Sequence, residues 1–240
     1  MCSVDRHLLL PSVCALALLA GACSSEVSTS SSNAVEPSAA SDTAAPETTE
    51  AATTVAETVD QLLDTIGAAY DADPTRTFAT GHSNGGMLSY RLACELSDRI
   101  VAVALQAGSL GVEPCEPTTP VSLLHLHGTA DTNHPIEGGF GSGLANVDFR
   151  SAIDSVTMVA AAGGCSGEPT VTVDASNPDL TATTWTDCDG GTEVQLVAVE
   201  GAPHAWMRHT PSNPSATPAY MGLDASIAVL QFLFAHPRAA

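Results

Sequence analysis

The residues with the clearest potential for chemistry lie at positions 81–86, which read Gly-His-Ser-Asn-Gly-Gly. They place Ser83 in a Gly-x-Ser-x-Gly pattern between a strand-like run and a helix-like run. Small flanking residues allow the sharp turn that exposes a nucleophilic serine Oγ, and the N–H of the next residue, Asn84, can then stabilise an oxyanion. The pattern therefore predicts nucleophilic attack by Ser83, although it also arises by chance in a chain with 19 glycines.

A serine hydroxyl is a weak nucleophile unless a histidine acts as its base and a carboxylate orients that histidine. Asp131 and His204 follow Ser83 in the chain, and each of the three comes at the end of a strand-like run. The carboxyl ends of parallel strands meet at one edge of a sheet, where α/β proteins build their sites. We therefore predict a catalytic triad of Ser83, Asp131 and His204.

Two members of this triad have competing interpretations. Asp131 could simply shape a turn with the polar residues after it, and His134 and His209 are alternatives to His204. His204 is favoured because it directly follows a buried type of strand and has Trp206 beside it to pack the loop.

His125 and His127 form a second polar pair in an apolar run. Residues two apart on a strand point to the same face, so the two rings could bind zinc together. Hydrogen-bonded histidines near the end of a sheet are the favoured interpretation. We predict no metal site and no cofactor.

The elements that would position these residues follow from the spacing of apolar side chains. Helices are expected at 59–70, 84–95, 149–162 and after a capping Asp224, and strands at 76–80, 100–105, 121–127, 170–173, 181–186 and 193–199. In the last helix Ile227, Leu230 and Phe234 share one face. Strands that alternate with helices predict a mainly parallel α/β sheet.

The N-terminal segment is predicted to direct export. Residues 1–23 carry a basic flank and a short apolar run with small residues at its end, which is typical of a signal peptide. Residues 19–23 resemble a bacterial lipobox, so Cys23 is the candidate for lipidation, with plain secretion as the alternative. Residues 24–54 are rich in Ser, Thr, Ala and Glu and predict a disordered tether. The folded domain is expected at 55–240.

The charge balance limits the classes of partner that the protein can bind. The formal net charge is -20, with seven basic residues, all of them arginine. Such a chain cannot neutralise a run of phosphates, which disfavours nucleic acid, and it is not attracted to anionic lipid. We expect an exported protein that contacts a membrane only through a lipid anchor.

Four cysteines remain in the predicted domain, namely Cys94, Cys115, Cys165 and Cys188. An even number in an exported domain predicts two disulfides, for which three pairings are possible. Closeness in sequence favours Cys94 with Cys115 and Cys165 with Cys188. A metal site is the alternative, but no close Cys or His spacing supports it.

Three segments together resemble the polyhydroxybutyrate depolymerase and feruloyl esterase family of exported α/β-hydrolases. They are residues 81–94 around the serine, 126–139 around the aspartate and 201–206 around the histidine. The resemblance runs from about residue 55 to the C-terminus. It implies esterase activity, with the predicted serine, aspartate and histidine as nucleophile, orienting acid and base. It also supports the cysteine pairing favoured above.

The chain departs from this family before the nucleophile. There the family has further strands and a His-Gly-rich loop that supplies the second oxyanion N–H, whereas here one helix and one short strand precede Ser83. We therefore expect an α/β-hydrolase-type, mainly parallel sheet truncated at its N-terminal side. The strand at 76–80 would then be an exposed edge, open to self-association.

Two functional hypotheses follow. The first is an exported serine esterase that hydrolyses a polyhydroxybutyrate-type polyester or a feruloyl or acetyl ester of a polysaccharide. The alternative is a catalytically impaired, surface-tethered hydrolase remnant that keeps the triad but lacks a complete oxyanion hole.

Overall fold

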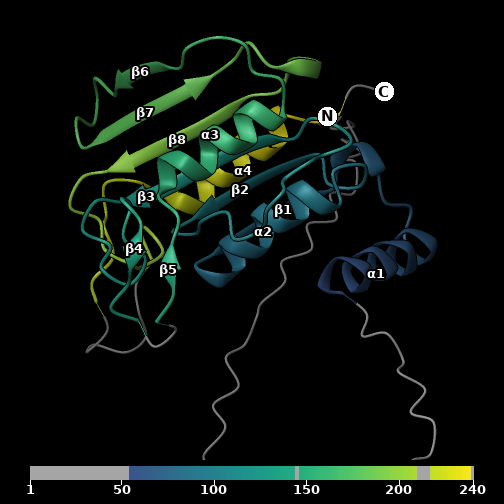
Figure 1. Ribbon diagram of the computed structural model, residues 1–240, viewed down its shortest axis with the longest axis horizontal. Helices are drawn as coiled ribbons and strands as arrows, with labels where there is room; N and C mark the ends of the chain where they lie inside the picture. Colours follow the sequence, from purple (N-terminus) through teal and green to yellow (C-terminus); the bar gives the residue numbers. More distant parts are fainter. Residues whose placement is uncertain (1–53, 144–145, 210–216, 239–240) are drawn as a thin grey trace, which may run out of the picture.

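The computed structural model describes residues 54–143, 146–209 and 217–238 (Figure 1). The predicted signal peptide, Cys23 and the tether up to residue 53 lie outside the described residues, as does the C-terminal end of the chain. Among the described residues, no helix has the length and apolar character needed to cross a membrane.

A six-stranded sheet in the order β1-β2-β3-β8-β7-β6 forms the centre of the domain. Its strands are β1 (Phe78–His82), β2 (Ala102–Gln106), β3 (Ser122–Gly128), β6 (Thr170–Val173), β7 (Leu180–Trp185) and β8 (Val194–Val199). The first three and β8 are parallel, and β7 and β6 are added antiparallel at one side. The predicted mainly parallel α/β sheet is confirmed.

Four α-helices accompany the sheet: α1 (Val55–Ala69), α2 (Asn84–Glu95), α3 (Ala152–Ala162) and α4 (Ala225–Ala235). Side-chain oxygens of Thr54, Ser151 and Asp224 accept backbone N–H bonds at the starts of α1, α3 and α4, which fixes where these helices begin. Asp224 is thus the predicted cap. Between β1 and α2 the chain reverses at Ser83.

Several boundaries differ from the sequence expectation, and the first helix begins at Val55 rather than residue 59 because Thr54 caps it there. The first strand begins at Phe78 rather than residue 76, because Pro74–Arg76 forms a short 3-10 helix η1. The third long helix begins at Ala152 rather than 149, because β5 (Asp148–Phe149) pairs antiparallel with β4 (Gly139–Phe140). This small hairpin has too short an apolar pattern to be read from sequence.

Helices cover both faces of the sheet (Figure 1), and buried side chains form a core on each face. Side chains of α2 and α3 pack with alternate residues of the parallel strands on one face, and α4 packs on the other. In α4 the buried residues are Ala225, Val229, Phe232 and Leu233. The face shared by Ile227, Leu230 and Phe234 is the exposed one.

Two disulfides tie loops to the helices. Cys94 at the end of α2 is bonded to Cys115, and Cys165 after α3 is bonded to Cys188. These are the pairs that closeness in sequence favoured. Each bond closes a loop next to an element of the core, so both limit the freedom of the unfolded chain.

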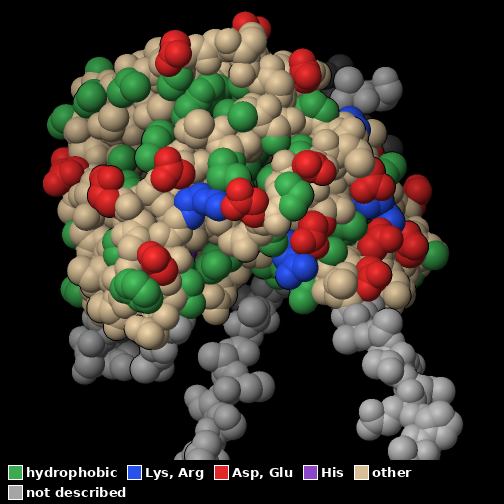
Figure 2. Space-filling view, in the orientation of Figure 1, with side chains coloured by type: hydrophobic (Ala, Val, Ile, Leu, Met, Phe, Trp, Pro, Cys, Tyr) green, Lys and Arg blue, Asp and Glu red, His purple; other side chains and the backbone are tan. Residues whose placement is uncertain are grey.

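The face of the molecule in Figure 2 is acidic. Figure 2 shows Asp and Glu side chains spread over the face in view, with few Arg among them.

β1 is at one edge of the described sheet. The Thr77 carbonyl and Ser83 N–H bond toward β2, so the backbone groups of Phe78, Thr80 and His82 face outward.

Candidate active site

The predicted nucleophile occupies a strained turn between β1 and α2. Ser83 has φ 56° and ψ -118°, a left-handed conformation that is rare for a residue with a side chain. Its N–H donates to the Gln106 carbonyl oxygen at 3.0 Å, which anchors the turn to β2. A Cβ atom on Gly81 would collide with the backbone of Gly85. The Gly-x-Ser-x-Gly pattern therefore forms the sharp turn that it predicted.

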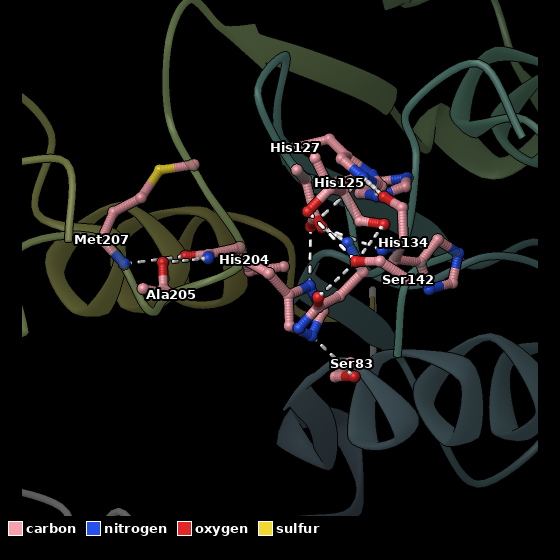
Figure 3. A network of polar contacts seen from close by, with 12 residues as sticks. Ser83, His125, His127, His134, Ser142, His204, Ala205 and Met207 are labelled. Carbon is pink, nitrogen blue, oxygen red and sulfur yellow. Dashed lines mark hydrogen bonds and ion pairs between the residues drawn. The ribbon is translucent and has the colours of Figure 1, made fainter. Parts of the chain in front are cut away.

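The three predicted triad residues meet at the carboxyl edge of the sheet (Figure 3). The Ser83 Oγ lies 3.0 Å from His204 Nε2, and His204 Nδ1 lies 2.7 Å from Asp131 Oδ2. A carboxylate can only accept, so Nδ1–H donates to Asp131, and the neutral ring accepts the Ser83 hydroxyl proton at Nε2. This is the geometry in which a histidine can act as a base toward a serine.

The buried Asp131 carboxylate accepts three hydrogen bonds. Its Oδ1 accepts N–H bonds from Asn133 at 3.0 Å and His134 at 2.9 Å, while Oδ2 faces His204. Burial raises the pKa of Asp131, but the bonds from His204 and His134 and the nearby ring of His127 outweigh it. The pKa therefore lies below its ordinary value, and the group is a carboxylate at neutral pH. The turn interpretation and the triad interpretation of Asp131 are thus both compatible with its contacts.

The competing histidines are placed differently. The His134 side chain is buried and stacks on Phe149, with ring centroids 3.8 Å apart. His209 is exposed, and its N–H donates to the Trp206 carbonyl. Of the three candidates, His204 is the one within hydrogen-bond distance of Ser83.

The loop after β8 is held by Gln106, a fully buried residue at the end of β2. Its Nε2 donates to the Ala205 carbonyl at 2.8 Å, and its Oε1 accepts the Met207 N–H at 3.0 Å (Figure 3). Its own carbonyl accepts the Ser83 N–H. Gln106 thus fixes the nucleophile turn and the histidine loop relative to each other. Sequence reasoning missed it, and the one signal was a polar residue directly after an apolar run.

Backbone hydrogen bonds join the loop that carries Asp131 to the loop that carries His204. The N–H groups of Thr129 and Ala130 donate to the carbonyls of Val199 and Ala202 at 3.0 and 3.1 Å. A Cβ atom on Gly128 would collide with the Ala202 carbonyl. Glycine at 128 therefore lets the acid loop and the histidine loop lie in contact.

Asn84 is the first residue of α2. The first four N–H groups of a helix have no partner within it, and they carry the positive end of the helix dipole. The Asn84 N–H therefore has the position that an oxyanion donor requires, and its role as donor stays a prediction. We assign no second donor among the described residues.

Known proteins that are similar in sequence to this chain include esterases. No family model matches the chain. The chain is 31% identical over 140 residues to feruloyl esterase B of Piromyces equi, an alignment that covers 55% of this chain and 25% of that protein. It is 26% identical over 150 residues to the bifunctional acetylxylan esterase/xylanase XynS20E of Neocallimastix patriciarum, which covers 61% of this chain and 20% of that protein.

The chain is therefore similar in sequence to a feruloyl esterase over about half of its length. It spans about a quarter or less of the length of these two relatives. A solved structure of an acetyl xylan esterase from Aspergillus awamori is 15% identical, with a TM-score of 0.46 over 62% of this chain and 61% of that one.

The His82 side chain packs directly on the candidate base, His204. Its ring centroid lies 4.7 Å from that of His204 and 6.1 Å from that of Trp206. Burial, and then the charge that His204 would carry, lower the pKa of His82 to about 4. His82 is therefore neutral at pH 7 and supports the His204 ring without adding charge. Sequence reasoning named His82 only as part of the serine pattern.

The predicted histidine pair on β3 is engaged in hydrogen bonds. His125 Nε2 lies 2.9 Å from His127 Nδ1, and the outer nitrogens of the two rings contact the Tyr90 hydroxyl and the His134 carbonyl. Burial is the main cause that lowers the pKa of both rings. All four nitrogens have partners, which favours the hydrogen-bonded interpretation over zinc. Within residues 54–143, 146–209 and 217–238, no cluster of three or more His, Cys, Asp or Glu is arranged to hold a metal ion.

Proposed function

We propose that this chain is a serine esterase that hydrolyses a carboxylic ester through a covalent acyl-enzyme. The observation that carries the proposal is the continuous contact from Ser83 Oγ through His204 to Asp131, at 3.0 and 2.7 Å. The strained turn at Ser83 and the esterase names of the relatives support it.

In the proposed reaction, Ser83 Oγ attacks the ester carbonyl carbon while His204 Nε2 takes the hydroxyl proton. Asp131 holds the His204 ring and stabilises its positive charge. The carbonyl oxygen becomes an oxyanion that accepts a bond from the Asn84 N–H. Collapse of this intermediate breaks the bond to the alcohol oxygen, which receives the proton from His204. Water then attacks the acyl-enzyme with His204 as base, which releases the acid and restores Ser83.

The proposed substrate is a feruloyl or acetyl ester of a polysaccharide. The printed names of the relatives, feruloyl esterase and acetylxylan esterase, support this class. A polyhydroxybutyrate-type polyester is the second substrate class, which rests on the resemblance of the three sequence segments alone. Hydrolysis rates on an acetylated xylan, a feruloylated oligosaccharide and a polyhydroxybutyrate suspension would rank the classes.

We also propose that the protein is exported. Residues 1–23 would act as a signal peptide with lipidation at Cys23, residues 24–54 as a tether and residues 55–240 as the esterase domain. The disulfides Cys94–Cys115 and Cys165–Cys188 support export, because such bonds persist in oxidising compartments. Mass spectrometry of the protein recovered from cells would detect a lipid on Cys23 or its absence.

Hydrolysis of p-nitrophenyl acetate tests the proposed reaction. Ser83→Ala should reduce turnover to background, because it removes the nucleophile. Ser166→Ala is the matched control, since Ser166 is exposed and its hydroxyl bonds to Asp187 in a loop outside the candidate site. Equal activity in wild type and Ser83→Ala would rule out the assignment.

A surface-tethered remnant with an incomplete oxyanion hole is the competing function. The observation that favours it is that Asn84 is the single oxyanion donor assigned among the described residues. Loss of one donor typically lowers turnover on the order of 10²–10³-fold. A folded sample that neither hydrolyses esters nor reacts with a fluorophosphonate would support this alternative.

A further inference from the structure

A chain of buried polar side chains runs through the core behind the candidate acid. The Tyr90 hydroxyl on α2 lies 2.9 Å from His125 Nδ1, and His125 Nε2 lies 2.9 Å from His127 Nδ1. His127 Nε2 then lies 2.8 Å from the His134 carbonyl oxygen. Tyr90, His125 and His127 are all fully buried. Figure 3 shows His125, His127 and His134 beside one another on the far side of His204 from Ser83.

One arrangement of protons satisfies every member of this chain. The His134 carbonyl can only accept, so His127 must carry its proton on Nε2. His127 Nδ1 then accepts from His125 Nε2–H, and His125 Nδ1 accepts from the Tyr90 hydroxyl. The His134 carbonyl thus sets the tautomers of both rings, and the Tyr90 hydroxyl completes the arrangement by donating to His125.

This series of hydrogen bonds ends at His134, which also binds the candidate acid Asp131. The N–H of His134 donates to Asp131 Oδ1 at 2.9 Å, and the carbonyl of His134 accepts from His127. His127 Nε2 also lies 3.7 Å from Asp131 Oδ2, the oxygen that faces His204. The Nε2–H of His127 is therefore directed at the His134 carbonyl oxygen and lies near Asp131 Oδ2. The opposite tautomer would turn a lone pair toward these two oxygens and repel them.

We propose that His127, with its tautomer set by the His134 carbonyl and matched by His125 and Tyr90, is a positioning residue that holds Asp131 in line with His204. The proposal rests on the proposed esterase function, because it assigns a task within that site. A buried polar chain is costly unless every group is bonded, and it gives rigidity where all groups are. An apolar core would pack the same space but would leave the acid loop without this contact.

Four variants distinguish a positioning role of His127 from a general contribution of buried side chains to the stability of the fold. His127→Leu removes the donor at similar size, and His127→Gln returns an amide N–H near the place of Nε2. Tyr90→Phe removes only the hydroxyl that donates to His125 at the far end of these hydrogen bonds. Ser155→Ala is the matched control, because Ser155 is also fully buried and its Oγ bonds to the Leu110 N–H and Ser151 carbonyl rather than to a residue that contacts Asp131.

The first readout is the split between kcat and KM on a p-nitrophenyl ester. His127→Leu should lower kcat on the order of 10²-fold with little change in KM, because a displacement of about 1 Å can have that effect. His127→Gln should recover much of the loss, and Tyr90→Phe should lower kcat less. Ser155→Ala should lower the urea midpoint without a comparable fall in kcat. Should His127→Leu fail to fold, His127→Gln and Tyr90→Phe decide the matter.

The second readout is the proton NMR signal of His204 Nδ1–H, which a bond to a buried carboxylate shifts far downfield. The signal should be present in wild type and Ser155→Ala, and weakened or lost in His127→Leu. An unchanged signal, together with a kcat no lower than in Ser155→Ala, would overturn the positioning role. A wild-type protein with the signal but without hydrolysis would instead count against the proposed function, and the variants' NMR spectra would still test His127.

Discussion

At the scale of single residues, burial sets the charge of the histidines around the candidate site. Burial, followed by the charge of neighbouring histidines, lowers the pKa of His82 and of His134 to about 4 each. Both rings are therefore neutral at pH 7. A positive charge on either ring would stand close to the protonated His204 that the proposed reaction forms.

The free energy of unfolding should therefore fall as the pH falls from about 6.5 to about 4. In this window the unfolded histidines, with an ordinary pKa of 6.5, bind protons that the folded His82 and His134 do not. Below about pH 4, protonation of Asp131, whose pKa is lowered, removes further stability. Urea unfolding at several pH values measures the slope. The His134→Gln variant should show a smaller dependence of the free energy of unfolding on pH, whereas the exposed His209→Gln should not change it. A wild-type dependence in His134→Gln would contradict this prediction.

Sequence reasoning could name the serine, aspartate and histidine of the site because each follows a strand and their order in the chain is recognisable. Gln106 and Tyr90 could not be named in this way. Their roles depend on which backbone lies across from them in the folded sheet, namely the histidine loop and the ring of His125. No pattern within a single strand or helix carries that information.

At the scale of elements, the site depends on the close approach of the loops after β3 and β8. Gly128 permits this approach, because any side chain there meets the Ala202 carbonyl. Apolar runs were enough to predict β2, β3 and β8 within two residues. They could not predict the β4–β5 hairpin, whose two-residue strands bury little and pair through backbone bonds.

Gly128→Ala should lower both stability and kcat. Overpacking of this kind typically costs about 1–3 kcal/mol, and the displaced Ala202 backbone carries the His204 loop with it. Thermal unfolding and p-nitrophenyl acetate hydrolysis measure the two effects. Gly67→Ala is the matched control, since a Cβ there meets nothing within 4 Å and Gly67 lies within α1. Alanine in a helix should leave kcat unchanged and raise stability slightly. A Gly128→Ala protein with wild-type properties would refute the role given to this contact.

At the scale of the whole molecule, β1 is an edge strand of the described sheet, next to the exposed apolar face of α4. The ring of Phe234 on that face lies 6.2 Å from the ring of Phe78 on β1. Outward backbone groups beside apolar side chains favour pairing with another chain. The net charge of -20 opposes such pairing between two copies.

We therefore predict self-association that increases with salt concentration, because salt screens the repulsion between copies. Sedimentation velocity at low and high salt measures it. Thr80→Lys should reduce association, since Thr80 is exposed on β1 and an edge lysine blocks strand pairing. Gln61→Lys makes the same charge change on the exposed surface of α1 and should have little effect. A monomer at every salt concentration would contradict the prediction.

Reaction with a fluorophosphonate, followed by peptide mapping, tests the central claim most directly. The probe reacts with a serine only when a neighbouring base activates it, so the label reports the Ser83–His204–Asp131 arrangement without a choice of substrate. We predict one label per chain, on Ser83, with no labelling of Ser83→Ala and much slower labelling of His204→Gln. A folded protein that stays unlabelled, or that is labelled at another serine, would contradict it.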